Sequence, residues 1–560
     1  MSIGGKPRFC MDPKLLSKLK KVISGDVATD STTLAEHSHD ASLFEMVPQA
    51  VVYPKNEKDL ESLVNFVNEN KKAYPKLSLT GRSAGTDMGG GSINDSIIVN
   101  FMKYFNSPPT IKDRIATTQP GVFYRDFEKV TMREGLLFAS YPASRGLCAM
   151  GGIVNNNSGG EKSLQYGKTE NFVRRVRVVL RDGKTYEFKK ITMAALEKKI
   201  KQDDVEGEVY KKMYKLIKDN YDTIMDAKPQ VSKNSAGYAL WNVWDKEAGT
   251  FDLTRLWVGA QGTLGLMTEA DIELVPMHMH REMVVLFLHD LKHLGEIINT
   301  AIPLKPESFE SYDDNTLKLA LKYFPEFAKQ LGAKGFVGSG IAFFPEFLMV
   351  MKSGLPQLVL QIDFTGNDLE ELKQKVATLK EKLAPLHPQL KVAIESQEEK
   401  YWLIRRESFN LLRKKIKNKH TAPFIDDFVI KPEHIAEVMP QVNKIIQKHK
   451  DFIYTVAGHV GDGNFHIIPL VDITKKNIRD AIPQISKEVY ELIIKYGGSI
   501  TGEHNDGLVR TPYLRQMYGA KVYELFEETK KIFDPQNIFN PRKKVGVTMD
   551  YSMHHLRMSW

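Results

Sequence analysis

Glycine is concentrated in three widely separated segments of this sequence. The first is GRSAGTDMGGG at 81–91, the second spans 142–160 and contains GGIVNNNSGG, and the third is GAQGTLG at 259–265. Loops of small residues let backbone N–H groups approach a phosphate or a flat ligand closely. None of the three matches GxxxxGK[ST] or GxGxxG. Each loop alone is compatible with a flexible surface turn, but three of them together favour an extended ligand such as a dinucleotide.

The segments around the first glycine loop alternate between strand and helix patterns. AVVYP at 50–54, LSLTG at 77–81 and SIIVNF at 96–101 predict short strands, and DLESLVNFVNEN at 59–70 has apolar residues at helical spacing. This order is typical of an α/β unit. After about 277 a strand and helix pattern begins afresh and continues as an α+β pattern, which predicts a second domain.

The composition excludes several classes of protein. The 560 residues carry 78 Lys and Arg against 69 Asp and Glu, a mild and scattered excess, so nucleic acid is not an expected partner. Cys10 and Cys148 are too few for a disulfide framework or a four-thiolate iron–sulfur cluster. The N-terminus lacks a signal-peptide core, and Pro345 and Glu346 interrupt the most apolar run, 335–351. We therefore expect a cytoplasmic protein without a transmembrane helix.

A histidine pair in the run GHVGDGNFH is the strongest candidate for metal binding. His459 and His466 are seven residues apart, and Gly461 and Gly463 between them disfavour a helix. The loop can therefore turn both imidazoles toward one point. Two imidazoles and a carboxylate suit Zn²⁺, Mn²⁺ or Fe²⁺, and Glu503 in TGEHNDG is the candidate carboxylate. A pair of purely structural histidines is the alternative.

Two further groups are candidates for direct chemistry. His504 follows Glu503, and an imidazole that is not bound to a metal can accept a proton whereas a metal-bound one cannot. A hydrogen-bonding role beside the metal is its alternative. Arg405 and Arg406 lie at the start of the apparent helix WLIRRESFNLLR, where one of them could hold an acidic substrate. A solvated charged face fits the same pattern.

Taken together, these segments resemble the FAD-binding superfamily of vanillyl-alcohol oxidase and p-cresol methylhydroxylase, and in particular its D-2-hydroxyacid dehydrogenase branch. The resemblance runs from about 45 to 545. TGRSAGTDMGG is similar to the pyrophosphate loop of that family, GGIVNNNSGG to its flavin-contacting loop, and GAQGTLGLMTEA to its GSEGTLGxxTxA motif. VAGHVGDGNFH and TGEHNDG are similar to its metal and catalytic motifs. Within the branch, HTAPFIDDFVIKPEHI most resembles bacterial respiratory D-lactate dehydrogenases.

The resemblance implies roles for individual residues. It places metal ligands at His459, His466 and Glu503, the catalytic base at His504, and the arginine for the substrate carboxylate at Arg405. It implies FAD held without a covalent bond, because the first glycine loop contains no histidine. The cofactor-binding residues that it implies are Thr80, Gly81, Arg82, Ser83, Ala84, Gly85, Thr86, Pro142, Ser144, Gly151, Gly152, Asn155, Ser158, Gly159, Gly262, Thr263, Gly265 and Asn540.

The implied fold is of the α+β class. It has a two-subdomain FAD-binding domain of the p-cresol methylhydroxylase type and an α+β cap domain of the FAD-linked oxidase C-terminal type. The expected parts are an N-terminal helical segment at 1–44, the FAD-binding domain at 45–276, the cap at 277–495, a segment at 496–545 that returns to the FAD domain with Glu503 and His504, and a tail at 546–560.

The implied activity is the FAD- and metal-dependent oxidation of D-lactate, or a close D-2-hydroxyacid, to the 2-oxoacid. Ile425 and Ile468 stand where D-2-hydroxyglutarate dehydrogenases of the family have a lysine and an asparagine, which favours a small apolar substrate over a dicarboxylate. Glycolate or D-2-hydroxyglutarate as substrate, and an accessory FAD-binding subunit without its own activity, are the alternatives.

The electron acceptor is expected to be a quinone or a separate carrier. No CxxCxxC pattern occurs in the sequence, so electrons would leave FAD directly. The apolar run 336–351 and the basic segment 414–419 could form a surface patch that contacts the inner face of the cytoplasmic membrane. A buried helix and a solvated charge run are the alternatives. The sequence leaves the oligomeric state open.

Overall fold

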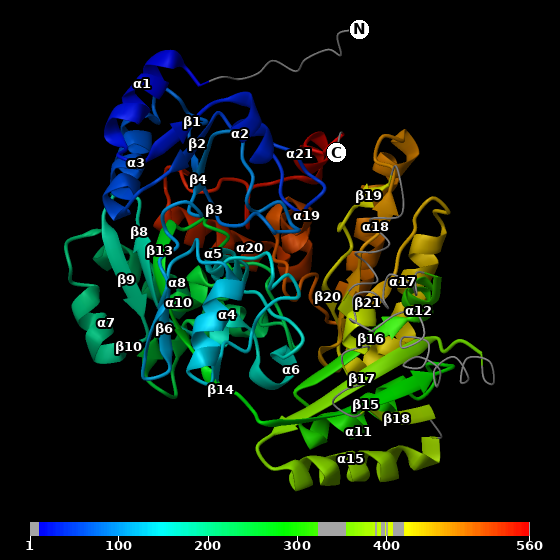
Figure 1. Ribbon diagram of the computed structural model, residues 1–560. Coiled ribbons are helices and arrows are strands. Elements are labelled where there is room, and N and C mark those ends of the chain that lie inside the picture. The colour runs from blue at the N-terminus through cyan, green and yellow to red at the C-terminus, as the bar shows by residue number, and fades with distance from the viewer. Residues whose placement is uncertain are drawn as a thin grey trace.

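The computed structural model describes residues 11–322, 354–386, 389–393, 398, 401–406 and 419–558. Figure 1 shows two neighbouring units: the first half of the chain forms one, and a broad sheet from the second half lies beside it. The last part of the chain, orange to red in the figure, runs back to the first unit.

The first layer is a four-stranded sheet in the order β1–β2–β4–β3, formed by Asp26–Ala28, Ala50–Tyr53, Ile97–Asn100 and Leu79–Arg82. β2, β4 and β3 are parallel, and α3, Glu57–Asn70, connects β2 to β3. Asn56 caps α3 by accepting from the N–H of Asp59. These strands and this helix confirm the α/β pattern predicted for 50–101.

A second, antiparallel sheet completes this unit. Its order is β5–β6–β13–β8–β9, formed by Thr110–Lys112, Ile115–Thr118, Leu266–Glu273, Val173–Val179 and Thr185–Lys189. The first glycine loop leaves the end of β3, and the third leads directly into β13. The short helix α5, Met150–Asn156, carries part of the second loop. The three glycine segments therefore start from neighbouring elements of one unit.

The cap contains a seven-stranded antiparallel sheet. Its order is β18–β15–β17–β16–β21–β22–β20, formed by Gln389–Ala393, His280–Leu288, Leu358–Gly366, Ser308–Asp313, Val456–His459, Asn464–Ile467 and Phe428–Val429. α15, Leu369–Leu383, packs on β15 and β17, while α17, Ile435–Gln447, packs on α18, Lys476–Lys495. The two candidate histidine ligands, His459 and His466, lie on β21 and β22, toward one end of this sheet.

The C-terminal residues pack against the first unit. α20, Leu514–Phe533, contacts α8, Val205–Asp219, and the N–H of Asn540 donates to the carbonyl of Leu79 (2.7 Å). The chain then forms α21, Met549–His554, and the N–H of Glu45 donates to the carbonyl of His555 (2.7 Å). The last described residues are thus held against the N-terminal part.

Two segments proposed from the sequence for membrane contact lie outside the described residues. They are the apolar run 336–351 and all but the last residue of the basic segment 414–419. Within the described ranges, no helix is both long and apolar enough to cross a membrane.

Candidate active site

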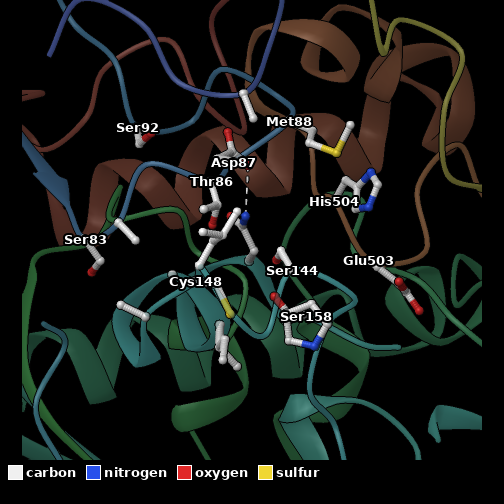
Figure 2. A pocket seen from close by; sticks show the side chains of 18 of the residues that line it. Ser83, Thr86, Asp87, Met88, Ser92, Ser144, Cys148, Ser158, Glu503 and His504 are labelled. Carbon is white, nitrogen blue, oxygen red and sulfur yellow. Dashed lines mark hydrogen bonds between the residues drawn. The ribbon is translucent and has the colours of Figure 1, made fainter. Parts of the chain in front are cut away.

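A cavity of about 680 Å³ lies between the glycine loops and the cap sheet. Its walls include residues from all three loops and side chains from the cap and the C-terminal segment. Figure 2 shows Glu503 and His504 on one side of this cavity and Ser83 and Thr86 on the other. One space therefore joins the candidate cofactor loops to the candidate metal ligands.

Most of the predicted cofactor-binding residues line this cavity. They are Gly81, Ser83, Ala84, Gly85, Thr86, Pro142, Ser144, Gly151, Gly152, Asn155, Ser158, Gly159, Gly262 and Gly265.

The remaining four lie behind the cavity wall and support it. Thr80 Oγ1 donates to Asn540 Oδ1 (3.0 Å), and Asn540 Nδ2 donates to the carbonyls of Gly91 (2.8 Å) and Gln261 (2.6 Å). Asn540 thereby ties the first glycine loop to the third. Thr263 and Arg82 bond the carbonyls of Ala260 and His39 respectively.

The loop at 83–86 has the properties of an anion cradle. All four residues line the cavity, and their backbone N–H groups find no acceptor among the described residues. Successive free N–H groups bind phosphate oxygens well. A Cβ added at Gly152 or Gly262 would meet nothing within 4 Å, so both glycines face open space that a flat ligand can fill. These features fit a dinucleotide such as FAD.

The predicted metal ligands converge on Glu503. β21, a short 3-10 turn and β22 form a hairpin that brings the rings of His459 and His466 within 5.3 Å of each other. His459 Nε2 lies 3.5 Å from Glu503 Oε1, and His466 Nε2 lies 3.9 Å from Glu503 Oε2. The two Nε2 atoms and the carboxylate thus face a common point. Only a three-residue 3-10 turn, Val460–Asp462, separates the two strands, so the expectation that no α-helix joins His459 to His466 is confirmed.

Two carboxylates set the orientation of both imidazoles. His459 Nδ1 donates to Glu310 Oε1 (2.6 Å), and His466 Nδ1 donates to Asp426 Oδ1 (3.2 Å). An ionised carboxylate only accepts hydrogen bonds, so each contact fixes the tautomer that leaves the lone pair on Nε2. This is the usual arrangement of a metal-binding histidine with its outer carboxylate.

Asp426 also contacts the candidate base. Its Oδ2 lies 2.7 Å from His504 Nδ1, which leaves Nε2 of His504 as the nitrogen that can accept a proton. Burial opposes a charged imidazole, but Asp426 and Asp427 outweigh burial and raise the pKa of His504 to about 9. A divalent cation on the neighbouring ligands would lower that pKa, because like charge disfavours the protonated form.

Asp427 holds the backbone that carries these groups. Its Oδ2 accepts from Thr501 Oγ1 (2.6 Å) and from the N–H groups of Glu503 (2.8 Å) and His504 (2.7 Å). Asp427 has a φ of 70°, a backbone conformation that non-glycine residues seldom adopt. The segment is therefore fixed by a carboxylate that is itself fully buried.

The site is rich in buried negative charge. Among the described residues, only Lys233 and Arg405 form Lys or Arg ion pairs with its carboxylates. Lys233 Nζ lies 2.7 Å from Glu503 Oε1 and 2.9 Å from Asp462 Oδ2. Burial opposes the charge of Lys233, but the two carboxylates raise the pKa of its ammonium. The buried carboxylates thus outnumber these two cations, and a bound divalent cation would balance part of the excess negative charge. The buried carboxylates are Glu310, Asp426, Asp427, Asp462 and Glu503.

Arg405 lies at the cap side of the same cavity. Its Nε pairs with Glu310 Oε2, so one glutamate contacts both Arg405 and the imidazole of His459. Arg405 Nη2 is buried and has no hydrogen-bond acceptor in the described part of the chain. An unfilled guanidinium donor in a cavity wall suits a carboxylate ligand.

Sequence reasoning missed Glu310, Asp426 and Lys233. The only signal for Asp426 is the pair of aspartates in FIDDFV, where apolar neighbours indicate that both carboxylates are buried. A second group of possible metal-binding atoms overlaps the predicted ligands and consists of Asp427, His466, Glu503 and His504.

Comparison with known proteins defines the class. The chain matches the FAD binding domain over residues 48–189 and the C-terminal domain of FAD linked oxidases over residues 277–544. The structure of p-cresol methylhydroxylase with substrate bound covers 98% of each chain, with a TM-score of 0.66 at 14% identity. The two matches together span most of the chain, which therefore belongs to the FAD-linked oxidases, and the likeness to p-cresol methylhydroxylase confirms the expected fold.

Curated relatives of the chain include hydroxyacid dehydrogenases. A D-2-hydroxyglutarate dehydrogenase of Haemophilus influenzae is 27% identical over 534 residues, which cover 93% of this chain and 50% of that protein. A D-lactate dehydrogenase of Archaeoglobus fulgidus is 25% identical over 497 residues, which cover 88% of this chain and 91% of that protein. The chain spans about half the length of four of the D-2-hydroxyglutarate dehydrogenases that it matches.

Proposed function

We propose that this protein oxidises D-lactate, or a close D-2-hydroxyacid, to the 2-oxoacid with bound FAD and a divalent metal. The observation that carries the proposal is the pair of imidazoles, His459 and His466, whose Nε2 atoms face Glu503 in the cavity that the glycine loops also line. Hydroxyacid dehydrogenases among its relatives support the same reaction class.

Each part of the cavity would serve one task. The loop at 83–86 and the walls at Gly152 and Gly262 would hold FAD, which supplies a two-electron acceptor for the hydride that leaves Cα. His459, His466 and Glu503 would hold a divalent cation of the Zn, Mn or Fe type, which supplies a Lewis acid for the substrate hydroxyl.

The chain's own groups would orient the substrate and move the proton. Arg405 would bind the substrate carboxylate through its unfilled Nη2. His504 Nε2 would accept the hydroxyl proton, so that loss of one proton and one hydride converts the alcohol carbon to a carbonyl. Asp426 would hold the His504 ring and stabilise the imidazolium that forms.

D-2-hydroxyglutarate is the second candidate substrate, because several of the curated relatives are dehydrogenases of that acid. Two features favour the shorter acid. Ile468 lines the cavity, whereas Ile425 is completely buried and contributes no polar group to it. Fewer polar groups then await a distal carboxylate.

We further propose that electrons pass to a quinone or a separate non-NAD carrier, and that the protein acts in the cytoplasm or on the inner face of the cytoplasmic membrane.

An accessory FAD-binding subunit without its own activity is less compatible with the site, because such a subunit needs neither the three candidate metal ligands nor His504. The absence of any oxidation by protein loaded with FAD and metal would favour it.

A substrate panel tests the proposal. Protein loaded with FAD and metal is mixed with D-lactate, L-lactate, glycolate or D-2-hydroxyglutarate and a soluble redox dye. We expect the highest kcat/KM with D-lactate and little reduction with L-lactate, whose hydride would leave from the opposite face. Equal rates with both lactate enantiomers would contradict the proposed geometry.

A further inference from the structure

Arg406 stands where two cavities meet. It lines the main cavity beside Arg405, and it also lines a second, open pocket of about 460 Å³ between the first unit and the cap. Lys162 and Arg281 line that second pocket as well. A guanidinium at this position carries positive charge to the end of the main cavity that adjoins the second pocket.

Glu161 holds Arg406 in place. Arg406 Nη2 donates to both carboxylate oxygens of Glu161 (2.6 and 2.7 Å), and Tyr141 donates its hydroxyl to Oε1 (2.9 Å). The guanidinium carbon lies 4.5 Å from the ring centre of Trp402. Glu161 is 9% exposed and the side chain of Arg406 is 33% exposed, so the carboxylate is buried beneath a partly exposed guanidinium. The carboxylate directly follows the second glycine segment, and the arginine belongs to the cap.

The two arginines therefore differ in what they offer a ligand. Arg405 has a buried Nη2 with no acceptor within the described ranges, which provides a place for one carboxylate. The charge of Arg406 is already matched by Glu161, which would repel a second carboxylate. Burial alone would raise the pKa of Glu161, but the arginine outweighs it and lowers that pKa to about 2, so Glu161 stays ionised at neutral pH.

We propose that Glu161 determines substrate length by retaining Arg406. The pair closes this end of the main cavity against a distal carboxylate, so short monocarboxylic 2-hydroxyacids are accepted and dicarboxylic ones are disfavoured. Without the negative charge, Arg406 becomes free to bind a distal carboxylate. Lys162 and Arg281 of the second pocket are both paired with Glu307, so Arg406 is the cation that the loss of Glu161 releases. The inference rests on the proposed oxidation of 2-hydroxyacids and specifies which of them are used.

The substitution Glu161→Gln tests this inference. The readout is the ratio of kcat/KM for D-lactate to that for D-2-hydroxyglutarate, measured with protein loaded with FAD and metal. We expect D-lactate to be preferred by the wild type and the ratio to shift at least about tenfold toward the dicarboxylate in the variant, as expected for one new charge-assisted contact. Adding Arg406→Ala to Glu161→Gln should remove the shift.

A matched control separates specificity from general damage. Glu208→Gln also removes a glutamate that pairs with an arginine, Arg181, but it lies outside both cavities, so its ratio should equal that of the wild type. If Glu161→Gln does not retain flavin absorbance, Glu161→Leu replaces it, since it also removes the charge.

The outcomes are distinct. A wild type that prefers D-2-hydroxyglutarate overturns the inference, and so does an unchanged ratio in the variant that retains flavin. A shift that persists when Arg406→Ala is added to Glu161→Gln also overturns the inference, because another group would then bind the distal carboxylate. A wild type that oxidises neither acid overturns the proposed function itself.

Discussion

Asp426 Oδ2 lies 2.7 Å from Nδ1 of His504. The other oxygen of the same carboxylate accepts from His466 Nδ1 (3.2 Å), so one buried side chain orients both the candidate base and a candidate metal ligand. Arg510 Nη2 donates to the backbone carbonyl of Asp426 (2.7 Å) and so holds the main chain that carries this carboxylate. The geometry joins proton transfer and metal binding through a single carboxylate.

Asp426→Asn should therefore impair two properties at once. An amide would no longer stabilise the imidazolium of His504 or fix its tautomer, and we expect flavin reduction by D-lactate to slow by about 10²-fold or more. Metal content should fall too, because His466 loses its carboxylate partner. Stopped-flow absorbance and metal analysis measure both. Asp472→Asn, at the surface, is the control, and an undiminished rate of reduction in Asp426→Asn would refute the role.

Lys233→Met should make folding stability depend more strongly on metal. The substitution leaves Glu503 and Asp462 buried without their ammonium partner, which costs about 3 kcal/mol in metal-free protein. A bound divalent cation would offset part of this loss, so added metal should raise the melting temperature more in the variant than in the wild type. Lys530→Met removes another buried lysine paired with a carboxylate, Asp534, far from these ligands. A similar metal effect in both variants would contradict the charge argument.

Gly152→Leu should reduce the amount of FAD bound without unfolding the protein. The glycine lies on α5, and its added side chain would project into open cavity rather than into protein atoms. Gly295→Leu on α11, Leu294–Ala301, is a matched control, since a Cβ there also meets nothing within 4 Å but lies away from the cavity. The ratio of flavin to protein absorbance measures the effect. Equal flavin content in the two variants would show that FAD lies elsewhere.

Stability should depend on pH through Asp363 in the core of the cap sheet. Burial raises the pKa of this carboxyl to about 6, even though the nearby Arg281 opposes the rise. Because the folded-state pKa exceeds the unfolded value near 4, the stabilisation is complete below about pH 4 and is lost as pH rises through 6. The predicted loss is about 3 kcal/mol.

Asp363→Asn removes this titration. We expect the free energy of unfolding of the wild type, relative to the variant, to decrease between pH 4 and pH 7, as measured by chemical denaturation. A constant difference across this range would indicate that Asp363 has the same pKa in the folded and unfolded states.

The parts of the structure that local patterns determine were predictable. The strands at 50–54 and 96–101, the helix at 59–70 and the bend between His459 and His466 all follow from the spacing of apolar residues or from glycine. The glycine segments also line one cavity, as a large ligand requires. These features depend on neighbours in the sequence.

The outer layer of the site was not predictable in the same way. Glu310 lies on β16, SFESYD, where four of the six residues are polar, a composition that indicates an exposed strand, yet all six residues are buried. Its charge is tolerated only because Arg405 and His459 arrive from distant parts of the chain. Glu161 and Arg406 are 245 positions apart, so nothing local indicates their pairing.

The most direct test of the central claim is anaerobic reduction of the bound flavin. Protein holding FAD and metal is mixed with D-lactate while the visible flavin absorbance is followed, and the measurement is repeated after a chelator has removed the metal. We predict rapid bleaching that is lost with the chelator and restored by added metal. Bleaching that is equally fast without metal, or no bleaching with FAD and metal both bound, would contradict the account.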